Sequence, residues 1–288
     1  MTITGAARVA GIIGWPVTQS VSPTLHGFWL AEMGIDGALV PLAVRPQDFS
    51  VAVRGLMASG FRGASITLPH KEAAFALAHE TDVAARAAGA VNLLVFHDDG
   101  RIEGRNTDAT GLAASLVEEL GPDVVRGRPA VILGAGGAAR AGVVAMHELG
   151  ASEVRILNRS RGRAEQMAAA LAGQVSPKLS VFELGEWSEA AAGAALAVNT
   201  TSAGMKDTPS LDLDMAALPK NAAVCDIVYN PRQTGLLKRA QADGLKTVGG
   251  LGMLIHQGVP AFEAFFGARP LVSAQLRAHL EKVLPGGK

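Results

Sequence analysis

The chain has 288 residues, which is enough for one large domain or two small ones with cores of their own. Its 26 basic and 26 acidic side chains cancel, which argues against nucleic acid or an anionic membrane as the main partner. No run reaches the roughly 20 apolar residues of a membrane helix, and no signal peptide is recognisable, so we expect a cytoplasmic protein.

The first 108 residues alternate short apolar runs with helix-period segments. This alternation predicts β-α-β units and a mostly parallel sheet covered by helices. The Asp-Gly pair within residues 97–104 predicts a hairpin tip. The expected strands are 8–14, 37–44, 63–67 and 90–96, and the expected helices are 23–34, 46–60 and 70–80.

A second α/β series begins near residue 109, and no Pro-rich or Ser-rich linker precedes it. We therefore expect a helix to join the two blocks, with the residues at the joint facing a cleft where a ligand can bind. Residues 129–140 predict a strand, a glycine turn and the start of a helix. The other expected strands are 153–159, 178–184, 195–201, 223–229 and 246–250, and the other helices are 110–121, 162–173, 234–244, 252–267 and 270–284.

The glycine turn "VILGAGGAAR" contains Gly134-x-Gly136-x-x-Ala139. Gly134 allows a tight turn, and Gly136 lets backbone N–H groups approach a pyrophosphate at the helix N-terminus. Ala139 is small enough for close helix–strand packing. The motif is a weak signal in an alanine-rich chain, but its place between a strand and a helix favours dinucleotide binding over a structural turn.

The end of the next strand indicates which dinucleotide binds. An NAD site usually carries Asp or Glu there, whereas this chain has Asn158 followed by Arg159, Ser160, Arg161 and Arg163. Guanidinium groups bind phosphate bidentately. The alternative is a solvated helix start, which is disfavoured because a helix N-terminus repels cations unless an anion is present. The pattern therefore predicts NADP rather than NAD.

Short polar residues follow several expected strands of the first block. Ser20 and Ser22 lie in a loop before a helix, Thr67 ends a strand, and Asn92 begins one. Ser22 could equally be a helix N-cap, as could Asp108 before the next helix. Because strand carboxyl ends of an open α/β sheet share one edge, this set suits a small polyhydroxylated ligand.

Lys71 is either a solvated charge in the first turn of a helix or an amine that moves a proton. Hydride transfer at a carbinol carbon needs a group that takes or returns the hydroxyl proton. A neighbouring carboxylate such as Asp108 would hold the amine in position and favour its charged form. We therefore predict a Lys71–Asp108 pair.

Other catalytic classes are poorly supported by the sequence. The seven histidines are scattered without the Cys, Asp or Glu neighbours of a metal site, so we expect surface or helix positions and no metal. The single cysteine, Cys225, lies in the apolar run "AAVCDIVY", which predicts a buried thiol and not a nucleophile. A lone cysteine also indicates a reducing compartment.

Nine stretches in order together resemble the shikimate dehydrogenase family over essentially the whole chain. They are "SVSPTLH", "ITLPHK", "GAVNLL", "GRNTDA", "GAGGAAR", "NRS", "NTTSAGM", "DIVYNP" and "GGLGMLIHQG". The resemblance implies reversible, NADP-linked reduction of 3-dehydroshikimate to shikimate. It implies an N-terminal open α/β substrate domain (1–108) completed by C-terminal helices (251–288) and a Rossmann-type NADP domain (109–250), and we expect a homodimer.

The resemblance also implies roles for individual residues. On the substrate side, Ser20 and Ser22 would bind the carboxylate, Thr67, Asn92 and Gln257 the ring hydroxyls, and Tyr229 would lie at the substrate. Lys71 and Asp108 match the catalytic pair, with Lys71 as general acid/base. On the cofactor side, the matching positions are Gly134, Ala135, Gly136, Gly137, Ala138, Asn158, Arg159, Ser160, Arg163, Ile227 and Gly250.

Two alternatives remain open. A paralogue acting on quinate or an aminated shikimate analogue would keep the Lys–Asp pair and change the hydroxyl-binding residues or the cofactor preference. A non-catalytic NADPH-binding sensor would keep the glycine turn and lose the proton-transfer pair. Ser20, Thr67 and the arginines after Asn158 favour the standard enzyme over the first, and Lys71 with Asp108 argues against the second.

Overall fold

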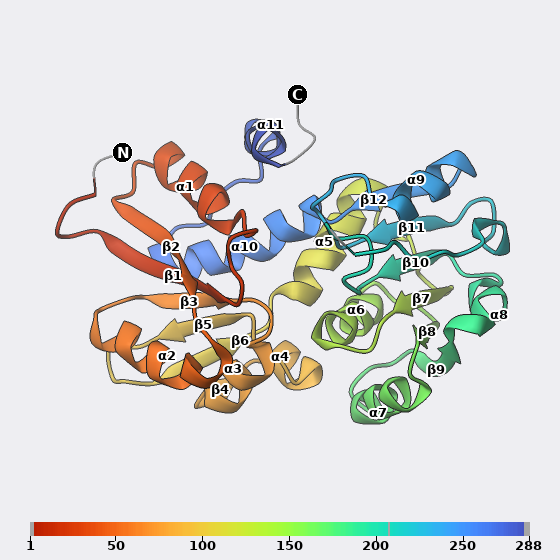
Figure 1. Cartoon of the computed structure of the whole chain (residues 1–288), viewed down its shortest axis with the longest axis horizontal. Helices are drawn as coiled ribbons and strands as arrows, with labels where there is room; N and C mark the ends of the chain where they lie inside the picture. Colours follow the sequence, from red (N-terminus) through yellow and green to blue (C-terminus); the bar gives the residue numbers. More distant parts are fainter. Residues whose placement is uncertain (1–2, 207, 285–288) are drawn as a thin grey trace. The chain divides into compact units, whose positions relative to one another are not determined.

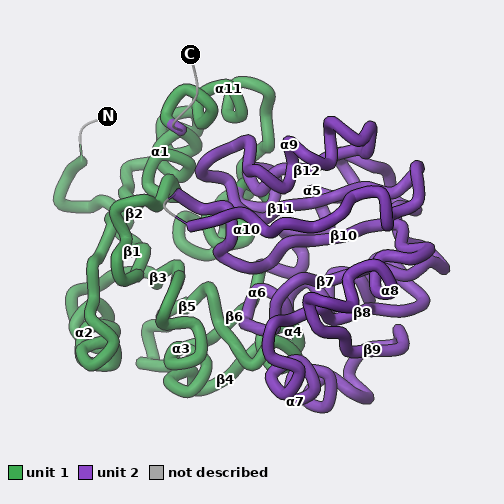
Figure 2. The backbone as a smooth tube through the Cα atoms, turned by 45° about the vertical axis from the view of Figure 1, so that its right-hand side comes forward, with its two compact units in different colours: residues 1–107, 255–283, 287 green, residues 108–254, 284–286, 288 purple. Residues whose placement is uncertain are grey.

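The computed structural model describes residues 3–206 and 208–284. The chain divides into two compact units (Figure 2). The first contains the residues up to 107 together with 255–283, and the second contains residues 108–254. Helix α10 (Leu251–Phe266) carries residues of both units, so the C-terminal segment completes the first unit.

The first unit is built on a six-stranded sheet of order β2-β1-β3-β5-β6-β4 (Figure 1). The pairs β1–β2, β1–β3 and β4–β6 are parallel, and the pairs β3–β5 and β5–β6 are antiparallel. The sheet is therefore mixed, and β5 and β6 form the hairpin that the Asp-Gly pair predicts. The strands are β1 (Arg8–Gly14), β2 (Gly37–Ala43), β3 (Gly63–Ile66), β4 (Glu80–Thr81), β5 (Leu93–Phe96) and β6 (Ile102–Arg105).

Local sequence explains the helices of this unit. Helix α4 begins after Asp82, whose side chain accepts a hydrogen bond from the Ala85 backbone at 2.6 Å, and it ends at Gly89 in the left-handed conformation (φ 58°). Both β4 and α4 are too short to show a periodic pattern of apolar residues, and neither element was predicted. The helices are α1 (Ser22–Glu32), α2 (Phe49–Ala58), α3 (Lys71–Leu77), α4 (Val83–Ala88) and α11 (Ala274–Val283).

The second unit is built on a fully parallel sheet of order β9-β8-β7-β10-β11-β12. Counted within the unit, this is the order 3-2-1-4-5-6 of dinucleotide-binding folds, with the reversal between β7 and β10. Buried apolar runs form its central strands, as expected for a sheet covered on both faces. The strands are β7 (Pro129–Leu133), β8 (Glu153–Asn158), β9 (Lys178–Glu183), β10 (Leu196–Asn199), β11 (Ala223–Asp226) and β12 (Lys246–Gly249).

The helices of the second unit connect these parallel strands. Helix α9 begins after an N-cap residue, Thr234, whose side chain accepts a hydrogen bond from the Leu237 backbone at 3.3 Å. The five-residue α8 was not predicted. The helices are α5 (Asp108–Leu120), α6 (Gly137–Glu148), α7 (Arg161–Leu171), α8 (Trp187–Ala191) and α9 (Gly235–Ala242).

Cys225 is buried in β11, as predicted, and burial raises the pKa of its thiol.

Two histidines lie in the interior of the first unit and not at its surface. His26 is buried in α1 against Trp29, Phe262 and Phe266, with ring centroids 5.4 to 6.2 Å apart within this group. His70 is also buried and stacks on Phe49 at 4.9 Å. Burial lowers the pKa of both imidazoles, to about 3 for His26. The expectation of surface or helix positions thus missed their burial.

Within the described residues, no helix has the length and apolar character that crossing a membrane requires.

Candidate functional site

Three of the expected substrate residues of the first unit are tied together through the backbone. The Thr67 N–H donates to the carbonyl of Ile13 in β1 at 2.9 Å, at the carboxyl edge of the sheet. The Asn92 carbonyl accepts from Ile66, one residue before Thr67, at 2.7 Å. The Lys71 carbonyl accepts from Val91, one residue before Asn92, at 2.9 Å. Thr67, Lys71 and Asn92 therefore begin or follow adjoining elements, and we call them the polar shelf.

The side chain of Asn92 is oriented by Thr107, a residue that the sequence analysis did not single out. The Asn92 amide nitrogen donates to Thr107 Oγ1 at 3.0 Å, and Asn92 Oδ1 accepts from the Thr107 backbone at 2.8 Å. Thr107 Oγ1 also donates to the Gln257 carbonyl at 3.0 Å. Because Asn92 and Thr107 are both buried, this contact links the polar shelf to the helix that carries Gln257.

Ser20 and Ser22 lie together at the beginning of α1. The Ser22 backbone donates to Ser20 Oγ at 3.3 Å, Ser22 is buried, and Ser20 is partly exposed. The alternative that Ser22 is an N-cap is wrong, because the helix starts at Ser22 and its N-cap is Val21 without a side-chain hydrogen bond. The Ser22 hydroxyl is therefore not used by the cap, which leaves its proposed substrate role as a prediction.

Asp108 and Tyr229 belong to the second unit. Asp108 is buried and is the first residue of α5, so it is a helical residue and not the residue before the helix, as the N-cap alternative required. Tyr229 is partly buried in the loop after β11, and burial raises the pKa of its phenol.

The glycine turn lies at the point where the strand order reverses. Gly134 has φ +120°, and a Cβ there would lie 2.9 Å from Thr200 Oγ1 and 3.1 Å from the Thr201 methyl group. Gly136 is the N-cap of α6, has no atom within 4 Å of where a Cβ would be, and leaves the helix N-terminus uncovered by a side chain. Backbone N–H groups at such a terminus bind phosphate groups, so the turn from Gly134 to Ala138 can hold a pyrophosphate.

A buried polar network is connected to this turn through Thr201. Asp226 Oδ1 accepts from the Asn199 amide at 2.9 Å and from the Val228 backbone at 3.1 Å, and Asp226 Oδ2 accepts from the Thr234 hydroxyl at 2.7 Å. Burial raises the pKa of this carboxyl, and the hydrogen bonds oppose that shift. Asn199 Oδ1 in turn accepts from the backbone of Thr201, which packs on Gly134. No local sequence pattern marks Asn199, Asp226 or Thr234 as members of such a network.

Ile227 and Gly250 come together in the second unit. A side chain on Gly250 would overlap the backbone carbonyl of Ile227. These two positions, expected near a nicotinamide, thus form a close backbone contact that only glycine permits.

The turn after β8 has the features expected of an adenosine-phosphate site. Asn158, and no carboxylate, ends the strand, and its amide donates to the Ser160 carbonyl at 2.9 Å. Arg159 and Arg163 are exposed and have no ion pair with any residue the structure describes. Arg161 instead binds Glu186 at 2.7 Å. Two exposed guanidinium groups therefore remain for a phosphate.

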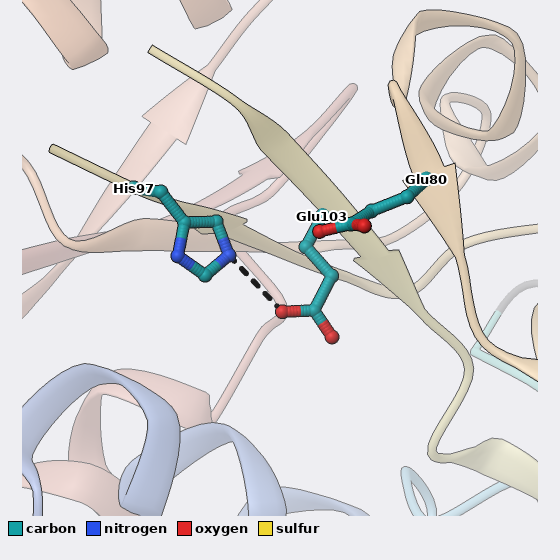
Figure 3. A group of neighbouring side chains, drawn as sticks. All are labelled: Glu80, His97 and Glu103. Carbon is teal, nitrogen blue, oxygen red and sulfur yellow. Dashed lines mark hydrogen bonds and ion pairs between the residues drawn. The ribbon is translucent and has the colours of Figure 1, made fainter. Parts of the chain in front are cut away.

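One histidine does have acidic neighbours, contrary to our expectation. Figure 3 shows His97 pointing toward Glu103, whose carboxylate is 3.1 Å from His97 Nε2, with Glu80 close by. One imidazole and two carboxylates could ligate a divalent metal. However, Arg105 binds Glu103 at 2.5 Å and Arg101 binds Glu80 at 2.6 Å. Both carboxylates are thus occupied by guanidinium groups, and we interpret the cluster as an ion-pair network.

Three family models cover most of the chain. They are the shikimate dehydrogenase substrate binding domain (residues 12–94), shikimate / quinate 5-dehydrogenase (residues 115–232) and the shikimate 5'-dehydrogenase C-terminal domain (residues 250–276). The first matches within the first unit, the second within the second unit, and the third begins just before α10.

Individual relatives agree with these models over nearly their full length. The chain is 52% identical to the NADP-dependent shikimate dehydrogenase of Paramagnetospirillum magneticum, covering 96% of this chain and 99% of the relative. It is 51% identical to that of Rhodospirillum rubrum, covering 96% and 98%. The structure of shikimate 5-dehydrogenase from Thermus thermophilus with NADP(H) and shikimate superposes with a TM-score of 0.83 at 34% identity, covering 95% and 98%. The chain therefore belongs to the shikimate dehydrogenase family of NADP-dependent oxidoreductases.

Proposed function

We propose that the chain catalyses the reversible, NADP-linked reduction of 3-dehydroshikimate to shikimate, with Lys71 as general acid/base and Asp108 as its partner. The observation that carries the assignment of Lys71 is its place in the polar shelf, where backbone hydrogen bonds tie it to the neighbours of Thr67 and Asn92. Lys71 is also partly buried, unlike a fully solvated surface lysine.

NADP supplies the hydride acceptor or donor when it is bound. In the oxidation direction, the Lys71 amine takes the proton of the reacting hydroxyl, and in the reduction direction its ammonium returns that proton. The Asp108 carboxylate holds the ammonium in position. Ser20 and Ser22 bind the substrate carboxylate, and the ring hydroxyls are held by a further set of side chains. That set is Thr67, Asn92 and Gln257, with Tyr229 beside the substrate.

The nucleotide is held entirely by residues of the second unit in this proposal. The glycine turn would bind the pyrophosphate through backbone N–H groups, and Ile227 and Gly250 would lie near the nicotinamide. The adenosine 2′-phosphate lies at the turn after β8, against Asn158, Arg159, Ser160 and Arg163. The exposure of Arg159 and Arg163 supports this last assignment.

Replacing Lys71 by alanine tests the catalytic role. We expect Lys71→Ala to lower shikimate turnover by roughly 10²- to 10⁴-fold, the range for loss of a general acid/base. The dissociation constant of NADPH, followed by its fluorescence, should change little. Lys238→Ala, on the exposed face of α9, is the matched control and should keep full turnover. A folded Lys71→Ala protein with normal turnover would disprove the role, and an unfolded one would make Lys71 structural.

Replacing Arg159 by alanine tests the 2′-phosphate site. We expect Arg159→Ala to raise the dissociation constant of NADPH by roughly tenfold or more, as for loss of a charge-assisted phosphate contact. NADH lacks the phosphate and should bind about as before. Equal weakening of both nucleotides in a titration would contradict the assignment.

The two remaining alternatives are separated by a substrate and cofactor assay. The assay measures the turnover of shikimate and of quinate, each with NADP and with NAD. The combination of shikimate and NADP should give the fastest turnover. Faster turnover of quinate with NAD would indicate a quinate enzyme, and nucleotide binding without any turnover would indicate a sensor. A cytoplasmic location and a homodimer stay predictions from the sequence.

A further inference from the structure

Arg161, the first residue of α7, binds two carboxylates beyond the end of the neighbouring strand. Its Nη2 donates to Glu186 Oε2 at 2.7 Å, and its Nε lies 3.6 Å from Glu183 Oε1. The three side chains are about half exposed, with 41%, 40% and 53% of Arg161, Glu186 and Glu183 accessible. Of the arginines in the turn after β8, Arg161 is thus directed toward the protein and not toward a ligand.

The two carboxylates are fixed by the backbone. The Glu183 N–H donates to Glu186 Oε2 at 2.6 Å, and the Glu183 carboxylate accepts from the Glu186 N–H, which forms a capping box at the 3-10 helix Leu184–Glu186. A surface glutamate would ordinarily move its charge away into solvent. Here both carboxylates accept backbone hydrogen bonds that hold their charges in place.

The position of this acidic pair matters because of the strand register. Glu183 at the end of β9 pairs directly with Asn158 at the end of β8. Neighbouring strands lie about 4.8 Å apart, so the pair sits one strand away from the turn proposed to bind the 2′-phosphate. A phosphate dianion there is repelled by the two carboxylates, and Arg161 offsets one of the two negative charges.

We infer that Arg161 is a specificity-determining residue for NADP that acts by compensating the charge of Glu183 and Glu186, without contacting the phosphate. The inference rests on the proposed function, since it takes the 2′-phosphate to lie at the turn after β8. Arg159 and Arg163 make the phosphate contacts. Arg161 does not contact the phosphate, and it reduces the net negative charge of Glu183 and Glu186 near it. NADH carries no 2′-phosphate and is almost insensitive to this balance.

The test is a charge-balanced pair of variants, assayed by fluorescence titration of the full chain with NADPH and NADH at low ionic strength. Arg161→Gln adds one net negative charge, and we expect NADPH to bind roughly three- to tenfold more weakly, with less effect at high salt. NADH should change less than about twofold. The double variant Arg161→Gln/Glu186→Gln has the net charge of the original chain, and it should restore NADPH binding to within about twofold. Arg54→Gln, on α2 of the first unit, is the control for an equal change in total charge.

Three results would overturn the inference. Failure of the double variant to restore NADPH binding would mean that Arg161 contacts the phosphate directly. Equal weakening of NADPH and NADH by Arg161→Gln would mean a structural role at the start of α7, and no effect on either would mean no role. Failure of the proposed phosphate site is distinguishable, because Arg159→Ala would then leave the preference for NADPH unchanged.

Discussion

Thr107 is the residue through which Asn92 and Gln257 are joined in the first unit. Its hydroxyl accepts from the Asn92 amide and donates to the Gln257 carbonyl, and its backbone N–H binds Asn92 Oδ1. One small side chain therefore orients one proposed substrate residue and fixes the backbone of another. We assign it a positioning role, since no contact of its own with the substrate is required.

We expect Thr107→Val, which keeps the shape of the side chain, to raise the KM for shikimate by roughly tenfold. The change removes one hydrogen bond from each of Asn92 and Gln257, and a buried polar group that loses its partner costs about 1–3 kcal/mol. Steady-state kinetics with saturating NADP would measure it. Thr107→Ser keeps the hydroxyl and should restore most of the affinity. Equal KM values for the valine variant and the original chain would show that Thr107 does not orient the site.

At the residue scale, the sequence could indicate candidates for the chemical roles but not the residues that orient those candidates. Thr67 follows the apolar strand β3, Lys71 begins α3, and Asn92 comes just before β5. Polar residues at such boundaries of apolar runs are themselves a signal. Thr107 carries no such signal, because its contact with Gln257 spans 150 residues of chain. The same holds for Asp226, whose importance is visible only once Asn199 and Thr234 converge on it.

At the element scale, long periodic segments were predictable and short ones were not. The buried parallel strands of the second unit read directly as apolar runs, and the glycine turn marks where α6 starts. The two-residue β4, the six-residue α4 and the five-residue α8 each span fewer than two periods of the strand or helix pattern that could reveal them. Tertiary contacts support the first two of these elements: the β4 backbone pairs with β6, and Asp82, the N-cap of α4, also accepts a hydrogen bond from the Asn106 backbone at 3.3 Å.

The strand order of each unit is a property that no local pattern contains. Alternating strands and helices predicted a mostly parallel sheet, and the Asp-Gly pair predicted the antiparallel hairpin of β5 with β6. The antiparallel pairing of β5 with β3 was not predicted. This arrangement brings Asn92, just before β5, beside the end of β3 and hence beside Thr67. The fold class was predictable, whereas the meeting of these two residues follows from a pairing direction that depends on the whole domain.

At the scale of the whole molecule, His26 makes stability depend on pH. The imidazole is fully buried among aromatic rings, and its Nδ1 has no hydrogen-bond partner among the residues that the structure describes. Burial lowers the pKa of this imidazole from 6.5 to about 3. Between these two values the unfolded chain binds a proton that the folded chain does not. The stabilisation is therefore complete above pH 6.5 and is lost progressively as the pH falls toward 3.

We expect the free energy of unfolding to fall by about 2 kcal/mol between pH 7 and pH 5 through His26 alone. Carboxyl groups such as Asp82, whose pKa is raised by burial, contribute to the pH dependence with the opposite sign. The difference between the original chain and His26→Leu isolates the histidine, since leucine fills the apolar site and cannot titrate. Urea unfolding at several pH values should show His26→Leu gaining relative stability as the pH falls, while His279→Gln, at an exposed position, should show no such gain. A pH-independent difference between the leucine variant and the original chain would mean that His26 is accessible to protons in the folded state.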